Sequence, residues 1–242
     1  MWLTAPGDDE AFWTYRDLAI FLGLAAPCLL AGAMLTKLAI VTLFLGTTHK
    51  ALELLPGQFL GYGFLYVALA FLLKFEYGRP FWQSLGFRLP KLGLPSIAAS
   101  GIALAFAIGI LGALLKAPQV PSPMMELLKD RVSSIAVAIF GITLGPLCEE
   151  LAFRGLMQPL FMRSLGVVPG IALSALAFGL LHLPQYGYTW QHGILITAAG
   201  AAFGVMRWIS GSTFGSTIMH SAYNLTLFVG FFAAGSSVPQ TW

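Results

Sequence analysis

The chain has 242 residues, of which 57% are hydrophobic and only 10% are charged, and its mean hydropathy is +0.81. Soluble domains carry about one quarter charged residues, so this composition excludes an ordinary soluble protein and predicts a polytopic membrane protein. The formal net charge of +3 comes from basic residues in short segments between apolar stretches. They form no basic stripe for phosphate, so we expect no nucleic-acid partner.

Seven apolar segments approach or exceed the roughly 20 residues that a helix needs to cross the hydrocarbon core. In chain order they are Leu18 to Gly46, Leu54 to Leu73, Leu92 to Leu115, Val132 to Met162, Val167 to Leu183, His192 to Ile209 and Phe214 to Ala234. The first and fourth are overlong, with breaks expected at Lys37 and at Gly145-Pro146, so eight spans is the alternative. We therefore predict an all-α fold, a polytopic transmembrane helical bundle of seven or eight spans that forms a single integral-membrane domain over residues 1–242.

The basic residues at the ends of these segments predict the orientation of the chain. With the N-terminus in the cytoplasm, the cytoplasmic side receives Arg16, Lys74, Arg79, Arg88, Lys91, Arg163 and Arg207. The outer side receives Lys50, Lys116, Lys129 and Arg131. The positive-inside rule therefore favours a cytoplasmic N-terminus. The main cytoplasmic loop would then be Glu76 to Lys91, which we expect to lie along the membrane surface.

Close helix packing is expected at three pairs of glycines spaced four residues apart. The pairs are Gly141 with Gly145, Gly200 with Gly204, and Gly211 with Gly215. Small residues at this spacing let the backbones of two membrane helices approach each other.

The later half of the chain places ionisable and amide side chains inside apolar segments. They are Glu149, Glu150, Arg154, His182, His220 and Asn224. Such residues are costly in a bilayer and occur mainly where they face the protein interior and have a function. The sequence therefore predicts a buried active site in this half of the chain.

Helical geometry brings these residues together. The turn around Leu165-Gly166 lies 16 residues after Glu149 and 16 residues before His182, so an antiparallel hairpin places both side chains at one depth. The last two segments form another hairpin, which returns His220 and Asn224 to the same membrane half on one helix face. We expect this cavity to lie in the cytoplasmic half of the bilayer.

Glu150 and Arg154 are spaced i, i+4 in the favourable order for a helical ion pair. We interpret the pair as mainly structural, because deleting one member of a buried ion pair strands the other charge at a cost of about 3 to 5 kcal/mol. Glu149 points about 100° away from Glu150 on the helix, so it is free to face another group.

These positions suit water-mediated acyl transfer. Glu149 is the candidate general base, and His182 is placed to hold the same water from the other side. His220 and Asn224 would supply two donors for the oxyanion that develops on the scissile carbonyl.

The same residues carry a family resemblance. Glu-Glu-x-x-x-Arg at 149–154, Phe-x-x-x-His at 178–182 and His-x-x-x-Asn at 220–224 follow one another on successive predicted helices. Together they resemble the three motifs of the CPBP family, the CAAX-processing and bacteriocin-processing intramembrane endopeptidases. This family includes the Ras-converting CAAX prenyl protease. The resemblance covers about residues 130–230, which we take as the catalytic core.

The resemblance implies a glutamate-type intramembrane endopeptidase, often labelled a metalloprotease. Glu149 and His182 would activate water, and His220 and Asn224 would stabilise the oxyanion. The supporting residues would be Glu150, Arg154 and Phe178, the last as a packing residue beside His182. The implied partners are the lipid bilayer and a membrane-anchored protein or peptide substrate, in a bacterial plasma membrane. Prenylated substrates do not follow from the match.

Three alternatives remain open at this level. A zinc ion held by Glu149, His182 and His220 would leave one position for water, but no His-Glu-x-x-His signature is present, so we expect no cofactor. A small transporter would spread polar residues along several helices, whereas here they cluster at one level. A non-catalytic immunity or scaffold protein would carry the same motifs. An unchanged phenotype in a Glu149→Ala mutant would indicate this alternative.

Overall fold

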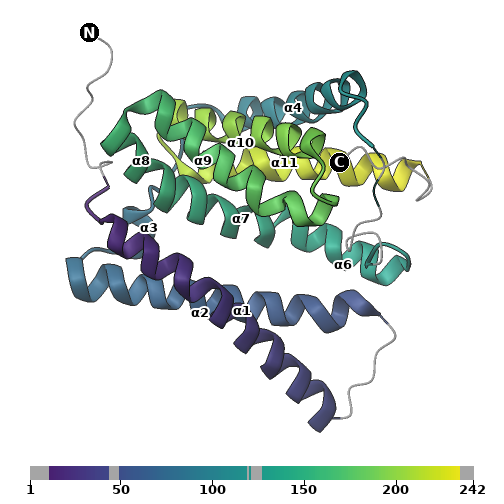
Figure 1. Ribbon diagram of the computed structural model, residues 1–242, viewed down its shortest axis with the longest axis horizontal. Helices are drawn as coiled ribbons and strands as arrows, with labels where there is room; N and C mark the ends of the chain where they lie inside the picture. Colours follow the sequence, from purple (N-terminus) through teal and green to yellow (C-terminus); the bar gives the residue numbers. More distant parts are fainter. Residues whose placement is uncertain (1–10, 44–48, 119, 121–126, 235–242) are drawn as a thin grey trace.

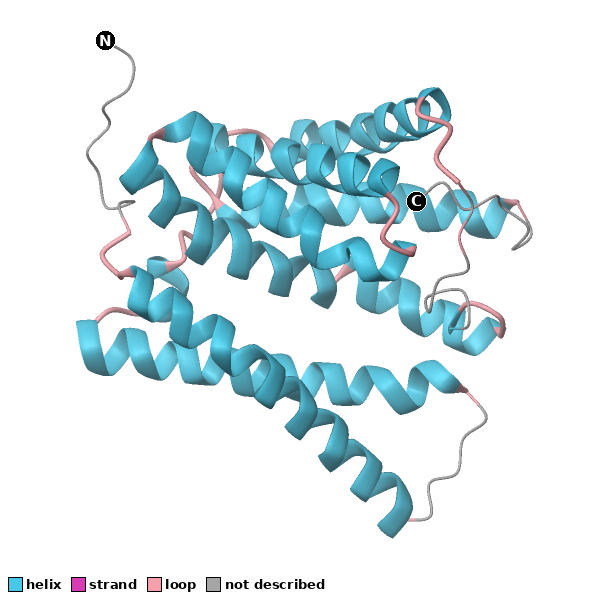
Figure 2. Cartoon of the chain, viewed as in Figure 1, coloured by secondary structure: helices cyan, strands magenta, loops and turns pink. Residues whose placement is uncertain are grey.

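The structure of the protein is a computed structural model that describes residues 11–43, 49–118, 120 and 127–234 (Figures 1 and 2). Its elements are α1 Tyr15–Thr42, α2 Lys50–Tyr77, α3 Phe81–Ser84, α4 Leu94–Leu114, α6 Arg131–Ile142, α7 Leu144–Glu150, a π-helix Leu151–Met157, α8 Gln158–Leu165, α9 Val167–His182, a 3-10 helix Leu183–Tyr186, α10 Trp190–Ser210 and α11 Thr213–Ala233. The described residues contain no strand, which confirms the expected all-α fold.

The protein is an integral multi-pass membrane protein. Six stretches of the described residues are long and apolar enough to cross a membrane, namely Tyr15–Thr42, Lys50–Tyr77, Leu94–Leu114, Arg131–Leu165, Val167–Tyr186 and Trp190–Ser210. The seventh predicted span corresponds to α11, which has 21 residues but is not among the six. Its serine, threonine, histidine and asparagine side chains make it more polar than the others. The segment between the third and fourth predicted spans lies partly outside the described residues, at residues 119 and 121–126.

The two expected breaks have different outcomes. Helix α1 continues through Lys37, so the first break is wrong. The fourth span does break, but at Thr143, whose φ of −117° and ψ of −83° separate α6 from α7. The cause is Pro146, which has no N–H to donate to the carbonyl of Ile142 four residues earlier. The break therefore falls on the N-terminal side of the proline.

Helices α1 and α2 form an antiparallel hairpin along one side of the molecule (Figure 1). Their backbones touch at glycines that we did not single out from the sequence. A Cβ added at Gly32 would lie 2.3 Å from the carbonyl oxygen of Gly57, and one at Gly61 would lie 2.7 Å from Cα of Leu29. Glycine is therefore required at this helix crossing.

A pair of alanine substitutions on α2 tests this crossing. Gly61→Ala and Gly63→Ala gain the same helix propensity, but a Cβ at Gly63 meets no atom within 4 Å. We expect Gly61→Ala to be less stable than Gly63→Ala by about 1–3 kcal/mol, the cost of overpacking. Thermal unfolding in detergent measures the difference. Equal stability of the two variants would show that the backbones do not touch.

The predicted glycine pairs differ in their roles. Gly200 and Gly204 do lie at a close contact between helices, since a Cβ at Gly204 would lie 2.7 Å from the side-chain oxygen of Gln158. For the third pair, Gly215 lies at a close contact between α10 and α11, since a Cβ there would lie 2.8 Å from Oγ of Ser210, but the prediction is wrong at Gly211. Gly211 has a φ of +65° and ends α10, so it serves the turn between helices rather than a helix crossing.

The loop Glu76 to Lys91 does not simply lie on the surface, because it is docked on the turn between α10 and α11. Thr213 donates its backbone N–H to Gly86 O (2.9 Å) and its hydroxyl to Leu85 O (2.6 Å). Leu85 is fully buried, and Lys91 donates its N–H to Ser210 O at 3.0 Å. The loop thus fixes the start of α11, the helix that carries two of the predicted site residues.

Candidate active site

The Glu-Glu-x-x-x-Arg motif spans a change of helix type. Glu149 and Glu150 end α7, and the π-helix Leu151–Met157 follows at once and contains Arg154. Short π-helical segments within α-helices are rare and occur frequently at functional sites. No residue type in the segment signals this wider turn, so the sequence analysis did not find it.

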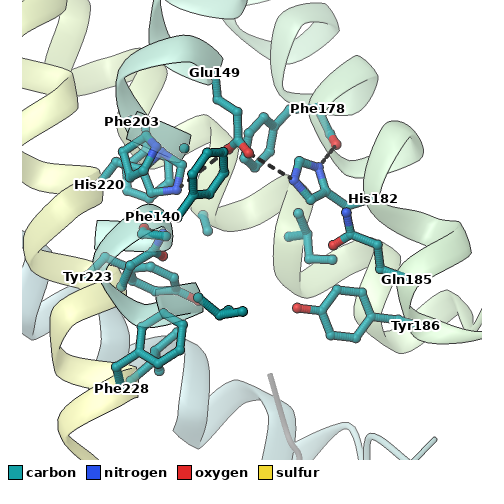
Figure 3. A pocket seen from close by; sticks show the side chains of 18 of the residues that line it. Phe140, Glu149, Phe178, His182, Gln185, Tyr186, Phe203, His220, Tyr223 and Phe228 are labelled. Carbon is teal, nitrogen blue, oxygen red and sulfur yellow. Dashed lines mark hydrogen bonds and ion pairs between the residues drawn. The ribbon is translucent and has the colours of Figure 1, made fainter. Parts of the chain in front are cut away.

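Glu149 lies between two histidines that come from different helices (Figure 3). Its Oε1 is 3.7 Å from Nε2 of His182 at the end of α9, and its Oε2 is 3.8 Å from Nε2 of His220 on α11. The carboxylate side chain is 25% exposed, against 16% for His182 and 5% for His220, so all three can reach one cavity. The two predicted hairpins do bring these residues together.

The second nitrogen of each histidine has a fixed role. Nδ1 of His182 lies 2.7 Å from the carbonyl oxygen of Phe178, and Nδ1 of His220 lies 3.0 Å from Oε1 of Glu150. Both oxygens are acceptors, so each Nδ1 carries the hydrogen. A neutral ring then presents the lone pair of Nε2 towards Glu149. The separations of 3.7 and 3.8 Å are too long for direct hydrogen bonds and suit a donor placed between these groups.

Glu150 and Arg154 form the ion pair that the sequence predicted. Both side chains are fully buried, and Nη1 of Arg154 donates to Oε1 of Glu150 at 2.8 Å. The guanidinium also donates to Gly200 O at 2.7 Å and lies 4.6 Å from the ring centre of Phe178. The same Oε1 accepts from His220 Nδ1, so the pair is joined to the site, a link that the sequence analysis missed.

Gln158 is a further residue that the sequence analysis missed. One turn after Arg154, its side-chain amide donates to Gly204 O at 3.0 Å, while Arg154 donates to Gly200 O. The two side chains thus hold two successive turns of α10. The absence of Cβ atoms at both glycines makes room for them, because a Cβ at Gly200 would lie 3.2 Å from Arg154 Nη2.

Asn224 lies on the same helix as His220 and lines the same cavity. Its side-chain amide donates to Gly141 O of α6 at 2.7 Å. An asparagine amide has two N–H groups, so this bond fixes the side chain and uses one of them.

The cavity has a volume of about 400 Å³ and lies between α2, α6, α7, α9, α10 and α11. Its wall includes residues from the first half of α2 and the last half of α11, which both lie at the end of the bundle away from Tyr15. Glu149 is 16 residues from the turn that begins at Leu165, about 24 Å along a helix. The helical stretch Arg131–Leu165 has 35 residues and is longer than a hydrocarbon core of about 30 Å, so its ends extend beyond the core and the position of the cavity in the cytoplasmic half stays a prediction.

The donor atoms do not fit the zinc alternative in this arrangement. The two Nε2 atoms approach different oxygens of Glu149, from His182 on one side and His220 on the other. Within the part of the chain that the structure describes, no group of three or more His, Cys, Asp or Glu side chains has a metal-binding arrangement. Metal independence stays a prediction, tested below.

Residues 131–226 match the family described as Type II CAAX prenyl endopeptidase Rce1-like. This segment is Rce1-like. It runs from α6 into α11 and contains all three motifs, so the resemblance predicted from those motifs is confirmed. The Rce1-like family supports an intramembrane endopeptidase of the CAAX type and a membrane-associated peptide or protein as its substrate. No curated protein and no solved structure matches the chain.

Proposed function

We propose that this protein hydrolyses a peptide bond of a membrane-associated protein or peptide with a water molecule activated between Glu149 and His182. One observation carries the proposal. Three acceptor groups, the carboxylate of Glu149 and Nε2 of two histidines, face one space while both Nδ1 atoms are occupied. A water molecule has two O–H donors, so it satisfies two of these acceptors and directs its lone pair outward.

The proposed reaction follows from this geometry. Water gives a proton to Glu149 as its oxygen attacks the scissile carbonyl carbon, and His182 holds the water in place. The remaining N–H of the Asn224 amide faces the oxyanion. A neutral His220 cannot donate to the oxyanion, because its single ring hydrogen is on Nδ1, which already donates to Glu150. It would donate from Nε2 only as an imidazolium, with both ring nitrogens protonated. When the C–N bond breaks, Glu149 returns its proton to the leaving amine.

Peptide cleavage by purified protein tests the proposal. Wild type and Glu149→Gln in the same detergent would be incubated with a mixture of short synthetic peptides, and new termini would be identified by mass spectrometry. We expect new termini with wild type only. Equal cleavage by both proteins would point to a contaminating protease and contradict the assignment.

We also propose that the reaction needs no metal ion. Preincubation with a zinc chelator, followed by its removal, is expected to leave the cleavage rate within about twofold of the untreated value, since no step passes through a metal. The same treatment of a known zinc protease controls for chelation. Loss of activity that added zinc restores would favour the zinc alternative.

Orientation is proposed from the basic residues, with the N-terminus on the cytoplasmic side of a bacterial plasma membrane. Single cysteines replacing Ser164 and Trp190 probe opposite ends of the bundle, in a background without Cys28 and Cys148. Both positions are exposed. We expect a membrane-impermeant maleimide to label Trp190→Cys and spare Ser164→Cys in intact cells. The reverse pattern would invert the orientation.

A further inference from the structure

The hairpin of α1 and α2 lies outside residues 131–226, the segment that matches the family, but one of its side chains is bonded to α7 (Figure 1). The ring of Tyr66 on α2 packs against Phe21 and Phe81, with ring centres 5.9 Å and 6.1 Å away. Its hydroxyl donates to the carbonyl oxygen of Cys148 on α7. Tyr66 therefore connects the hairpin to the helix that carries the first motif.

The carbonyl of Cys148 belongs to the peptide group that includes the nitrogen of Glu149. A peptide group is planar, so a hydrogen bond to this carbonyl fixes the direction in which the backbone enters Glu149. In a regular α-helix the donor to the same carbonyl is the N–H of Ala152, four residues later. The backbone N–H of Ala152 also interacts with the Tyr66 hydroxyl. This hydroxyl thus contacts both the acceptor and the donor of one α-helical hydrogen bond.

This contact coincides with the change of helix type. A side chain that enters the ladder of hydrogen bonds between residues i and i−4 is a known cause of helix distortion. The π-helix begins at Leu151, directly after the residues that Tyr66 holds. At its end, the N–H of Gln158 bonds to Phe153 O, five residues earlier, which is the wider spacing of a π-helix. The position of Tyr66 therefore accounts for the place where the wider turn begins.

The far end of the π-helix is held by a second residue from the N-terminal part of the chain. Trp13 precedes α1, is buried, and donates its indole N–H to Leu156 O at 3.0 Å. Leu156 is fully buried, so this carbonyl is shielded from water. Between the two ends, Ser174 of α9 donates its hydroxyl to Phe153 O at 3.2 Å. Side chains from three other segments thus bond to backbone carbonyls of this helix.

Given the proposed function, we infer that Tyr66 and Trp13 are positioning residues for the carboxylate of Glu149. Neither is among the described residues that line the cavity, so they act on the reaction through the backbone of α7 and the π-helix. A displacement of about 1 Å of a reacting group can lower a rate by about a hundredfold. The N-terminal hairpin therefore sets the direction of the general base as well as crossing the membrane.

Tyr66→Phe tests this inference, because it removes the hydroxyl and keeps the packed ring. The matched control is Tyr77→Phe on the same helix, which loses the hydrogen bond from its hydroxyl to the buried Asp17. The substrate is a peptide that wild type cleaves and Glu149→Gln does not. We expect Tyr66→Phe to lower kcat by about tenfold or more and to leave KM within about threefold. Tyr77→Phe should keep the wild-type kcat, even if thermal unfolding shows that both variants lose equal stability.

The outcomes separate this inference from the proposed function. A wild-type kcat in Tyr66→Phe, or an equal loss of kcat in Tyr77→Phe, would overturn the inference and leave the proposed function standing. If Tyr66→Phe does not fold, Trp13→Phe decides, since it removes the donor to Leu156 O. It is expected to lower kcat by about threefold or more, and an unchanged kcat would overturn the inference. Absence of any Glu149-dependent cleavage by wild type would overturn the proposed function and the inference with it.

Discussion

Glu149→Gln is expected to lower kcat by about a thousandfold, within the range that a general base contributes. A glutamine has the same shape as glutamate, but its amide cannot take a proton from water. The side chain faces the cavity and is 25% exposed, so the fold should persist. Single-turnover cleavage measures the rate, and thermal unfolding in detergent measures the stability.

Two further variants serve as comparisons for Glu149→Gln, one expected to lose activity and one expected to keep it. His182→Ala is expected to lose a comparable factor, because it removes the second group that holds the water. Glu53→Gln makes the same chemical change in the first turn of α2, outside the cavity lining, and should cleave at the wild-type rate. Near-normal turnover in Glu149→Gln would remove the basis of the proposed mechanism.

Arg154→Met is expected to destabilise the protein by about 3–5 kcal/mol, the cost of leaving a buried charge without its partner. It strands Glu150 inside the bundle and removes the hydrogen bond to Gly200 O. Because Glu150 also accepts from His220, activity should fall as well. Thermal or chemical unfolding of purified protein measures the loss of stability.

The double variant Glu150→Leu with Arg154→Met separates charge from packing. Replacing both members of a buried ion pair by apolar groups is often nearly neutral for stability. We therefore expect the double variant to be more stable than Arg154→Met alone, yet inactive because His220 loses its orienting partner. A double variant no more stable than the single one would show that stranded charge is not the cause.

The proximity of Glu149 to His182 could be predicted from the sequence, because it depends only on the number of residues between each of them and the turn at Leu165-Gly166. Equal distances from one turn place two residues of an antiparallel hairpin at one depth whatever the details of packing. The glycine contact between α1 and α2 was visible as Gly57 and Gly61, four residues apart.

Other features could not be read from the sequence. The π-helix after Glu150 depends on hydrogen bonds that no single residue type dictates. The bond from His220 to Glu150 joins residues 70 positions apart, and periodicity within one helix carries no information about it. The docking of the loop at Leu85 and Gly86 on the start of α11 likewise depends on tertiary packing.

The most direct test of the central claim is a comparison of protein termini in cells. Membrane and secreted proteins from cells that carry wild type would be compared with those from cells that carry Glu149→Gln at equal abundance. The account predicts mature termini that appear only with wild type. Identical termini, with Glu149→Gln still complementing a deletion, would contradict proteolysis and favour a non-catalytic role.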